Sequence, residues 1–184
     1  PNVEDAVFFD LNRDGILDVV GSCEGKTKSV FGYIAPPRQR LTVSAAWNRT
    51  TLVSNAVNTC WMFAEPIGDN EIVVGSRATN GQIGLLTYTQ DRWQYAMITD
   101  AGWIMSIRTV DVDGDGRYEV LVSDRKGTNR SCFLLRRGKN REWKRQDLTG
   151  SQAEFMFLDY LEVQNGSWMV CATRNGKLMC QKRD

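Results

Sequence analysis

Hydrophobic residues in this chain fall in short runs, and turns rich in glycine, asparagine, aspartate and serine separate these runs. The runs contain mainly Val, Ile, Leu, Phe, Tyr and Trp, a composition typical of short β-strands. No segment keeps its apolar residues at the spacing of about 3.6 residues that an amphipathic helix shows. The pattern therefore predicts an all-β chain with almost no helix.

Individual strands can be assigned within these runs. Between residues 1 and 55 the pattern predicts strands at 6–9, 17–21, 29–34 and 42–53, and between 101 and 150 it predicts strands at 104–110, 118–122, 131–136 and 142–148. The first strand of a set is apolar on both faces, as in 6–9 and 155–158. A single four-stranded sheet cannot bury both of its faces alone, so we expect the sheets to stack.

Two features recur along the chain. The first is a Trp followed five residues later by an aliphatic residue, at Trp47, Trp93 and Trp143, and we expect these indoles to pack between sheets. The second is a branched aliphatic run that ends in a small residue and a turn, around Val20, Val74 and Val122, with a looser copy at 169–173. These three valines lie 54 and 48 residues apart. That period is close to the roughly 40–50 residues of a four-stranded propeller blade.

The repeats predict one domain, an all-β propeller of four tandem four-stranded blades. The expected blades span about 1–55, 56–100, 101–150 and 151–184, and the last ends in its third strand. A closed propeller needs every blade completed. We therefore expect a part of a larger propeller, or a partial ring that another copy completes, as in a homo-oligomer.

Two Asp-rich loops precede the second strands of the first and third repeats, at 10–18 and 111–119. Both carry oxygen-bearing side chains at relative positions 1, 3, 5 and 9 and a Gly at position 6. Ca²⁺ takes about six to eight oxygen ligands, and a Gly permits the sharp turn around it. With position 7 contributing its backbone carbonyl, the expected ligands are Asp10, Asn12, Asp14, Ile16 and Asp18 in one loop and Asp111, Asp113, Asp115, Arg117 and Glu119 in the other.

The sequence thus predicts two Ca²⁺ sites, with two polar turns without metal as the alternative. Turns rarely need acids at four alternating positions, and carboxylates that converge without a cation repel one another. The second loop carries four carboxylates and the first carries three with Asn12, so we expect the second to bind more tightly. The corresponding segments of the other repeats, 66–71 and 162–167, have lost this pattern.

Together these features resemble the FG-GAP or VCBS repeat β-propellers, and runs such as 4–10, 101–106 and 123–127 are similar to a bacterial VCBS subfamily. The resemblance is carried by Asp10 to Ser22 and Asp111 to Asp124, where a calcium loop runs into a second strand. It implies a structural metal, seven blades in a complete propeller, and an extracellular, periplasmic or cell-surface location. It also implies that sugar or protein ligands bind the opposite face or the clefts between blades.

Composition narrows the function classes further. Lys and Arg number 23 and Asp and Glu 22, so the balanced charge gives no reason to expect nucleic-acid binding. No apolar run is long enough for a membrane span. The chain has no His, which excludes a Ser-His-Asp triad, a Cys-His pair and a His-ligated metal site within it. The cysteines show no C-x-x-C spacing and are expected as small buried residues.

Candidate ligand-binding residues follow the second strands, where the propeller would gather them around one mouth of its channel. They are Arg77, Asp124, Arg125 and Arg174, and an Arg-rich ring of this kind suits a carboxylated sugar or another anion, with ordinary surface charge as the alternative. Trp61 and Trp103, just before the inner strands, could form an aromatic platform for a sugar or could pack between blades.

Three functional hypotheses remain. The sequence favours a calcium-stabilised, non-enzymatic binding or scaffold module whose ligand is a carbohydrate or a protein. An alternative is the propeller part of a sugar lyase or dehydratase, although no clear acid–base pair is present. The third is a partial propeller that self-assembles and has an architectural role.

Overall fold

The computed structural model describes residues 2–54, 59–78, 81–128, 130–148, 154–162, 168–174 and 177–182, with side chains up to residue 161. Two short 3₁₀ helices, η1 (Arg38–Arg40) and η2 (Ser44–Ala46), are the helices of this part of the chain. No helix in the described ranges is long and apolar enough to cross a membrane. The strands are β1 (Asn2–Phe9), β2 (Asp18–Glu24), β3 (Ser29–Ile34), β4 (Asn48–Val53), β5 (Cys60–Pro66), β6 (Glu71–Arg77), β7 (Gln82–Thr89), β8 (Arg92–Asp100), β9 (Ile104–Val110), β10 (Glu119–Asp124), β11 (Cys132–Arg137), β12 (Trp143–Asp147), β13 (Phe155–Glu162), β14 (Trp168–Arg174) and β15 (Lys177–Lys182).

The all-β prediction is confirmed. The strands form antiparallel sheets in chain order, which we call sheets 1 to 4: β1 to β4, β5 to β8, β9 to β12, and β13 to β15. Strands predicted at 29–34 and 104–110 coincide with β3 and β9. The strand predicted at 42–53 is shorter, because the chain before Asn48 forms η2 instead of extended structure.

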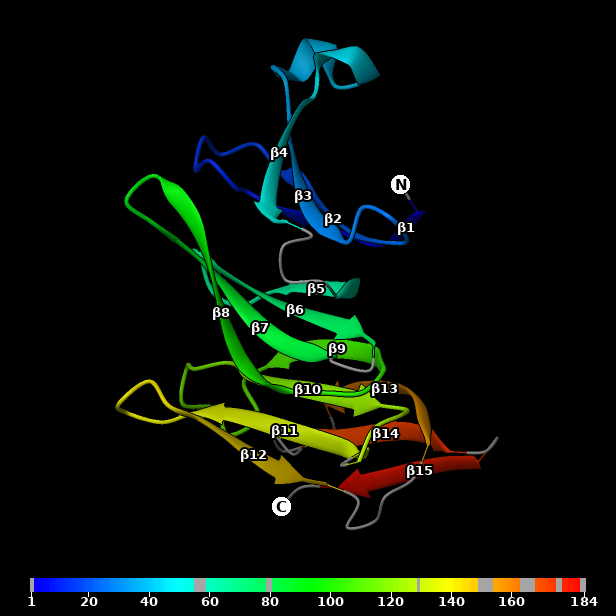
Figure 1. Ribbon diagram of the computed structural model, residues 1–184. Helices are drawn as coiled ribbons and strands as arrows, with labels where there is room; N and C mark the ends of the chain where they lie inside the picture. The colour runs from blue at the N-terminus through cyan, green and yellow to red at the C-terminus, as the bar shows by residue number, and fades with distance from the viewer. Residues whose placement is uncertain are drawn as a thin grey trace.

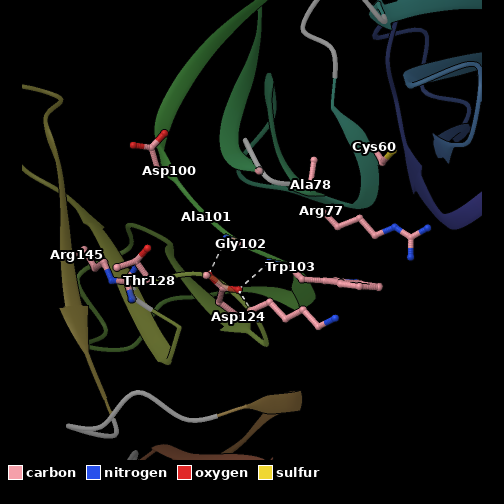
Figure 2. A pocket seen from close by; sticks show the side chains of 13 residues that line it. Cys60, Arg77, Ala78, Asp100, Ala101, Gly102, Trp103, Asp124, Thr128 and Arg145 are labelled. Atoms are coloured by element: carbon pink, nitrogen blue, oxygen red, sulfur yellow. Dashed lines mark hydrogen bonds between the residues drawn. The ribbon is translucent and has the colours of Figure 1, made fainter.

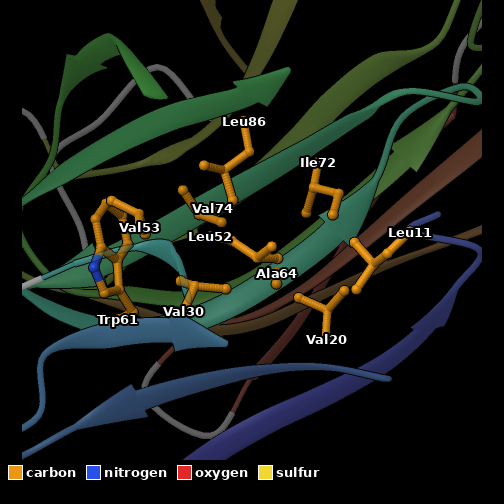
Figure 3. Packing of buried hydrophobic residues seen from close by; sticks show 10 residues of the cluster. All are labelled: Leu11, Val20, Val30, Leu52, Val53, Trp61, Ala64, Ile72, Val74 and Leu86. Carbon is orange, nitrogen blue, oxygen red and sulfur yellow. The ribbon is translucent and has the colours of Figure 1, made fainter. Parts of the chain in front are cut away.

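Successive sheets stack through their first strands, since β1 contacts β5, β5 contacts β9, and β9 contacts β13. Figure 1 shows this stack as an open arrangement of the described sheets, running from blue to red along the chain. Apolar side chains fill each space between neighbouring sheets. Between sheets 1 and 2 this core includes Val20, Val30, Trp61, Ile72 and Val74 (Figure 3).

Each inner strand carries a bulge at the same place. The register of β1, β5, β9 and β13 skips Glu4, Met62, Met105 and Met156 respectively. The sequence alone aligned Val20 with Val74 and Val122. When the sheets are aligned by their bulges instead, the residues equivalent to Val20 lie one position earlier in the second and third sheets. Val20 and Val73 face the following sheet, whereas Val74 and Val122 pack on the preceding one. The equivalent residues are therefore Val20, Val73 and Leu121, because a shift of one residue reverses the face of a strand.

Two of the three recurring tryptophans pack as predicted. Trp93 lies against the core between sheets 1 and 2, and Trp143 lies against the core between sheets 2 and 3. Trp47 instead belongs to the long connection before β4, where its Nε1–H donates to the Leu41 carbonyl at 3.0 Å. This indole therefore bonds within the connection between β3 and β4, and it is not part of the three described cores.

The cysteine prediction is confirmed for two of the described thiols. Cys23 and Cys132 are buried, and Cys60 is half-buried. Burial raises the pKa of the Cys132 thiol to about 12, so this residue is an unreactive thiol at neutral pH. The side chains of Cys171 and Cys180 lie outside the described part of the structure.

Candidate functional site

The loop between β1 and β2 is held by its own acidic side chains. The Asp10 carboxylate accepts hydrogen bonds from the backbone N–H groups of Asp14 at 3.1 Å and Gly15 at 2.9 Å. Asp14 accepts one from Ile16 at 2.8 Å. The Asn12 amide oxygen accepts from the Asp14 N–H at 3.1 Å, and its amide nitrogen donates to the Asp14 carboxylate at 3.0 Å. Four of the five predicted residues are thus joined by hydrogen bonds within the loop.

The loop between β9 and β10 repeats this network. Asp111 accepts hydrogen bonds from the N–H groups of Asp115 at 3.1 Å and Gly116 at 2.8 Å, and Asp115 accepts from Arg117 at 2.9 Å. Gly15 and Gly116, both at position 6, have φ of 81°. This left-handed conformation is one that Gly adopts without strain. The same spacing of residues therefore gives the same local fold in two separate sheets.

The acid at position 9 has a different role from the others, because it is buried. Asp18 accepts hydrogen bonds from the backbone N–H groups of Leu11 at 2.8 Å and Ala35 at 2.7 Å. Glu119 accepts one from Val112 at 2.9 Å. Burial raises the pKa of both carboxyl groups, although these hydrogen bonds oppose the shift. A cation at the loop would favour their charged forms.

Oxygens of three carboxylates in the second loop lie within 4.8 Å of one another, and they belong to Asp111, Asp113 and Asp115. Two guanidinium groups approach them: Arg117 lies 2.6 Å from Asp115, and Arg136 lies 3.5 Å from Asp113. The hydrogen bond from Arg117 lowers the pKa of Asp115. The donor set is all oxygen and suits Ca²⁺ or another hard cation, which would compete with the two arginines for these oxygens.

A second candidate site is a cleft at the opposite end of the sheets from these loops, with a volume of about 1020 Å³. It lies between the ends of β6 and β8, the start of β9 and the segment after β10 (Figure 2). The side chains that line it are those of Cys60, Arg77, Ala78, Asp100, Ala101, Trp103, Asp124, Lys126, Thr128 and Arg145, together with Gly81, Gly102 and Gly127. Three of the predicted ligand-binding residues, Arg77, Trp103 and Asp124, therefore share one cleft.

Asp124 holds the floor of this cleft together. The residue is 2% exposed, and its carboxylate accepts hydrogen bonds from the backbone N–H groups of Gly102 at 2.9 Å, Trp103 at 2.8 Å and Lys126 at 3.1 Å. These bonds use both of its oxygens and join the start of sheet 3's first strand to the segment after its second strand. Asp124 is therefore a positioning residue for the cleft.

Cations surround the indole of Trp103. Arg77, Lys126 and Arg125 lie 4.6, 4.6 and 5.6 Å from the centre of its ring. Trp61, the other predicted platform residue, is wholly buried and edge-on to Tyr95, so it offers no face to a sugar. Its burial supports the packing interpretation. The side chain of Arg174 lies outside the described residues.

A groove along the inner strands was not predicted. It has a volume of about 420 Å³, and its polar lining includes Asp5, Glu65, Arg108 and Asp159. The Arg108 guanidinium lies 3.5 Å from Asp159, and burial raises the pKa of Glu65. These residues have no common sequence motif. Glu65, Arg108 and Asp159 each lie three residues after the bulge residue of their strand, and Asp5 lies one residue after it. Only an alignment of the inner strands by their bulges could have brought them together.

Comparisons with known proteins do not identify the chain. A scan against protein-family models finds no match, and a search of the curated proteins finds none either. The function is therefore inferred from the residues and geometry of the chain itself.

Proposed function

We propose that the chain is a calcium-stabilised arc of a β-propeller, related to the FG-GAP or VCBS repeat proteins, which serves as a binding or scaffold module. Four meandering sheets stacked in chain order, with equivalent bulges in their inner strands, support a repeat of this kind. The ligand is a carbohydrate or a protein. The module works in an extracellular, periplasmic or cell-surface setting, where calcium reaches the concentrations that weak structural sites need.

The observation that carries the calcium proposal is the shared network of the two acidic loops. In both, the acid at position 1 holds the backbone of positions 5 and 6, and the three-carboxylate group of Asp111, Asp113 and Asp115 follows from this fold. Carboxylates held this close repel one another unless a cation lies between them. The metal would stiffen the connection between the first two strands of sheets 1 and 3, and it would not take part in chemistry.

Calcium titration of metal-stripped protein by calorimetry, with thermal melting alongside, tests this proposal. We expect two binding events, and calcium at a hundred times its Kd stabilises a folded protein by about 2.7 kcal/mol. For a chain of this size each kcal/mol raises the Tm by about 2–4 °C, so saturation of one such site should raise the Tm by about 5–11 °C.

Paired variants make the result specific. The double variant Asp111→Asn with Asp113→Asn should abolish the tighter event, since it removes two of the three grouped carboxylates. Asp100→Asn, an exposed acid at the opposite end of the sheets from the acidic loops, is the matched control and should leave both events unchanged. No binding at millimolar calcium would mean that the loops are bare turns.

The architectural alternative has one observation in its favour. In the described residues no sheet covers the far face of sheet 1, which is the side away from sheet 2, and Val3 of its inner strand is 51% exposed. A second copy could pack there and continue the stack. The mass measured by size-exclusion chromatography with light scattering decides this, because a monomer at all concentrations excludes it.

The enzymatic alternative would use the inner-strand groove. Asp5, Glu65 and Asp159 supply carboxyl groups there, and Arg108 supplies a cation. A sugar lyase or dehydratase needs an acid and a base of this type close to a substrate. Turnover of uronate or hydroxyacid substrates that is lost in Glu65→Gln would favour this alternative over a binding module.

A further inference from the structure

The cations around Trp103 differ in how far acidic neighbours neutralise them. Arg77 pairs with Glu24, and the Arg125 Nε lies 4.0 Å from a Glu154 carboxylate oxygen. Lys126 is exposed and forms no ion pair with any described carboxylate, although its ammonium group lies 4.6 Å from the Trp103 ring. Since a cation on an aromatic ring keeps its charge, Lys126 remains available to an incoming anion.

The two ends of the cleft differ in chemistry. Figure 2 shows Arg77 and Trp103 at one end, and Asp100, Thr128 and Arg145 toward the other. The Arg145 guanidinium is already engaged by Asp147 at 3.0 Å and by the Ser131 hydroxyl at 2.8 Å. The far end therefore presents mainly an acceptor, Asp100, and a hydroxyl, Thr128. Such an end hydrogen-bonds with the hydroxyl groups of a ligand and repels a compact polyanion.

Between these ends the floor is made of small residues. They are Ala78, Gly81, Ala101, Gly102 and Gly127. The backbone segments pack so tightly here that a Cβ on Gly81 would lie 2.4 Å from the Gly102 carbonyl oxygen, and one on Gly102 would lie 1.3 Å from that of Lys126. A floor without long side chains lets a ring lie close to the backbone, and the volume of about 1020 Å³ accommodates more than one ring.

We propose that this cleft binds an acidic saccharide, with the carboxylate of a uronate residue beside Lys126 and Arg77 and the sugar hydroxyls toward Asp100 and Thr128. The sugar ring lies over the floor of small residues. This assignment rests on the binding function proposed above and names its ligand class and site. It does not depend on calcium, because the acidic loops lie at the other end of the sheets.

The test is calorimetric titration of the whole chain with trigalacturonate, its neutral counterpart galactotriose, and a triglutamate peptide. We expect trigalacturonate to bind at least about tenfold more tightly than galactotriose, and its binding to weaken with salt. Triglutamate should bind weakly, because it lacks hydroxyl groups that could donate to Asp100. The exposed lysine gives a clean variant: Lys126→Gln should weaken trigalacturonate binding about tenfold, as expected for a charged hydrogen-bonding partner.

Lys139→Gln, an exposed lysine in the turn between β11 and β12, is the matched control and should bind like the wild type. Equal binding of the neutral sugar, equal losses in the two lysine variants, or preferred binding of triglutamate would each overturn the proposal, and the last would indicate an acidic peptide ligand. Calcium titration of the same preparation separates the two ideas. Calcium binding without uronate binding would refute only the proposed saccharide site. Uronate binding without calcium binding would refute only the proposed metal sites.

Discussion

The substitution Asp124→Asn tests how the cleft is held open. Asn has nearly the same size as Asp, but it loses the charge and replaces one acceptor oxygen with an NH₂ donor. The carbonyl oxygen can keep the bonds from Trp103 and Lys126, which share Oδ1 in the wild type. The NH₂ group then faces the Gly102 N–H, which donates to Oδ2 at 2.9 Å in the wild type, so two donors oppose each other.

The size of the effect follows from these three bonds. A hydrogen bond to a charged group is worth about 1.5–3 kcal/mol and a neutral one about 0.5–1.5 kcal/mol. The substitution removes one of these bonds and weakens the other two. Because the bonds are only partly buried, hydrogen bonds to water offset part of the lost free energy. We therefore expect the free energy of unfolding to fall by about 3 kcal/mol and the Tm to fall by about 6–12 °C.

Urea denaturation followed by tryptophan fluorescence, with thermal melting by circular dichroism, measures this change. Asp100→Asn is the matched control, because Asp100 lines the same cleft and its side chain is exposed. It should alter the free energy of unfolding by less than about 0.5 kcal/mol. Similar stability of Asp124→Asn and wild type, or equal losses in both variants, would refute the positioning role of Asp124.

Two further predictions concern the floor of the cleft and the inner groove. Gly102→Ala places a Cβ 1.3 Å from the Lys126 carbonyl oxygen and should cost more than about 3 kcal/mol of unfolding free energy, whereas Gly21→Ala, whose nearest neighbour is at 3.5 Å, should change it by less than about 1 kcal/mol. Comparable urea midpoints for these two variants would contradict this. Burial raises the pKa of Glu65 above 4.5, so the folded chain holds this proton more tightly than the unfolded chain and loses stability as pH rises through that window. Glu65→Gln removes this loss, and its Tm advantage over the wild type should therefore grow from about pH 4 to about pH 7, while a constant difference would contradict the reasoning.

Much of the fold could be predicted from the sequence, since the signals that define strands and turns are local. Alternation of short apolar runs with Gly and Asp gave the strands, and β3 and β9 coincide with their predicted ranges. The acidic loops were equally predictable, because most of their hydrogen bonds join residues within eight positions of each other. The bond from the Ala35 N–H to Asp18 is longer in sequence, since it spans 17 positions. The same residue types at the same spacing repeat the same network in sheets 1 and 3.

Register between repeats was less readable. The sequences around Val20 and Val74 are similar, yet Val20 packs on the following sheet and Val74 packs on the preceding one. Side chains alternate between the two faces of a strand, so an error of one residue reverses the assignment. The bulge that sets this register lies in the neighbouring first strand, at Glu4 in one sheet and Met62 in another, and it leaves no mark in the second strand's own sequence.

The sequence by itself determined an all-β chain, its repeat length and its two acidic loops. Only the tertiary structure decided what distant residues do. In the structure the Asp124 carboxylate accepts a hydrogen bond from the Gly102 N–H, and Trp61 is buried between sheets. Asp5, Glu65 and Asp159 line one groove. The reason is physical: local patterns fix the backbone conformation, whereas burial and the pairing of charges depend on which sheets stack, and that contact joins residues 40 or more positions apart.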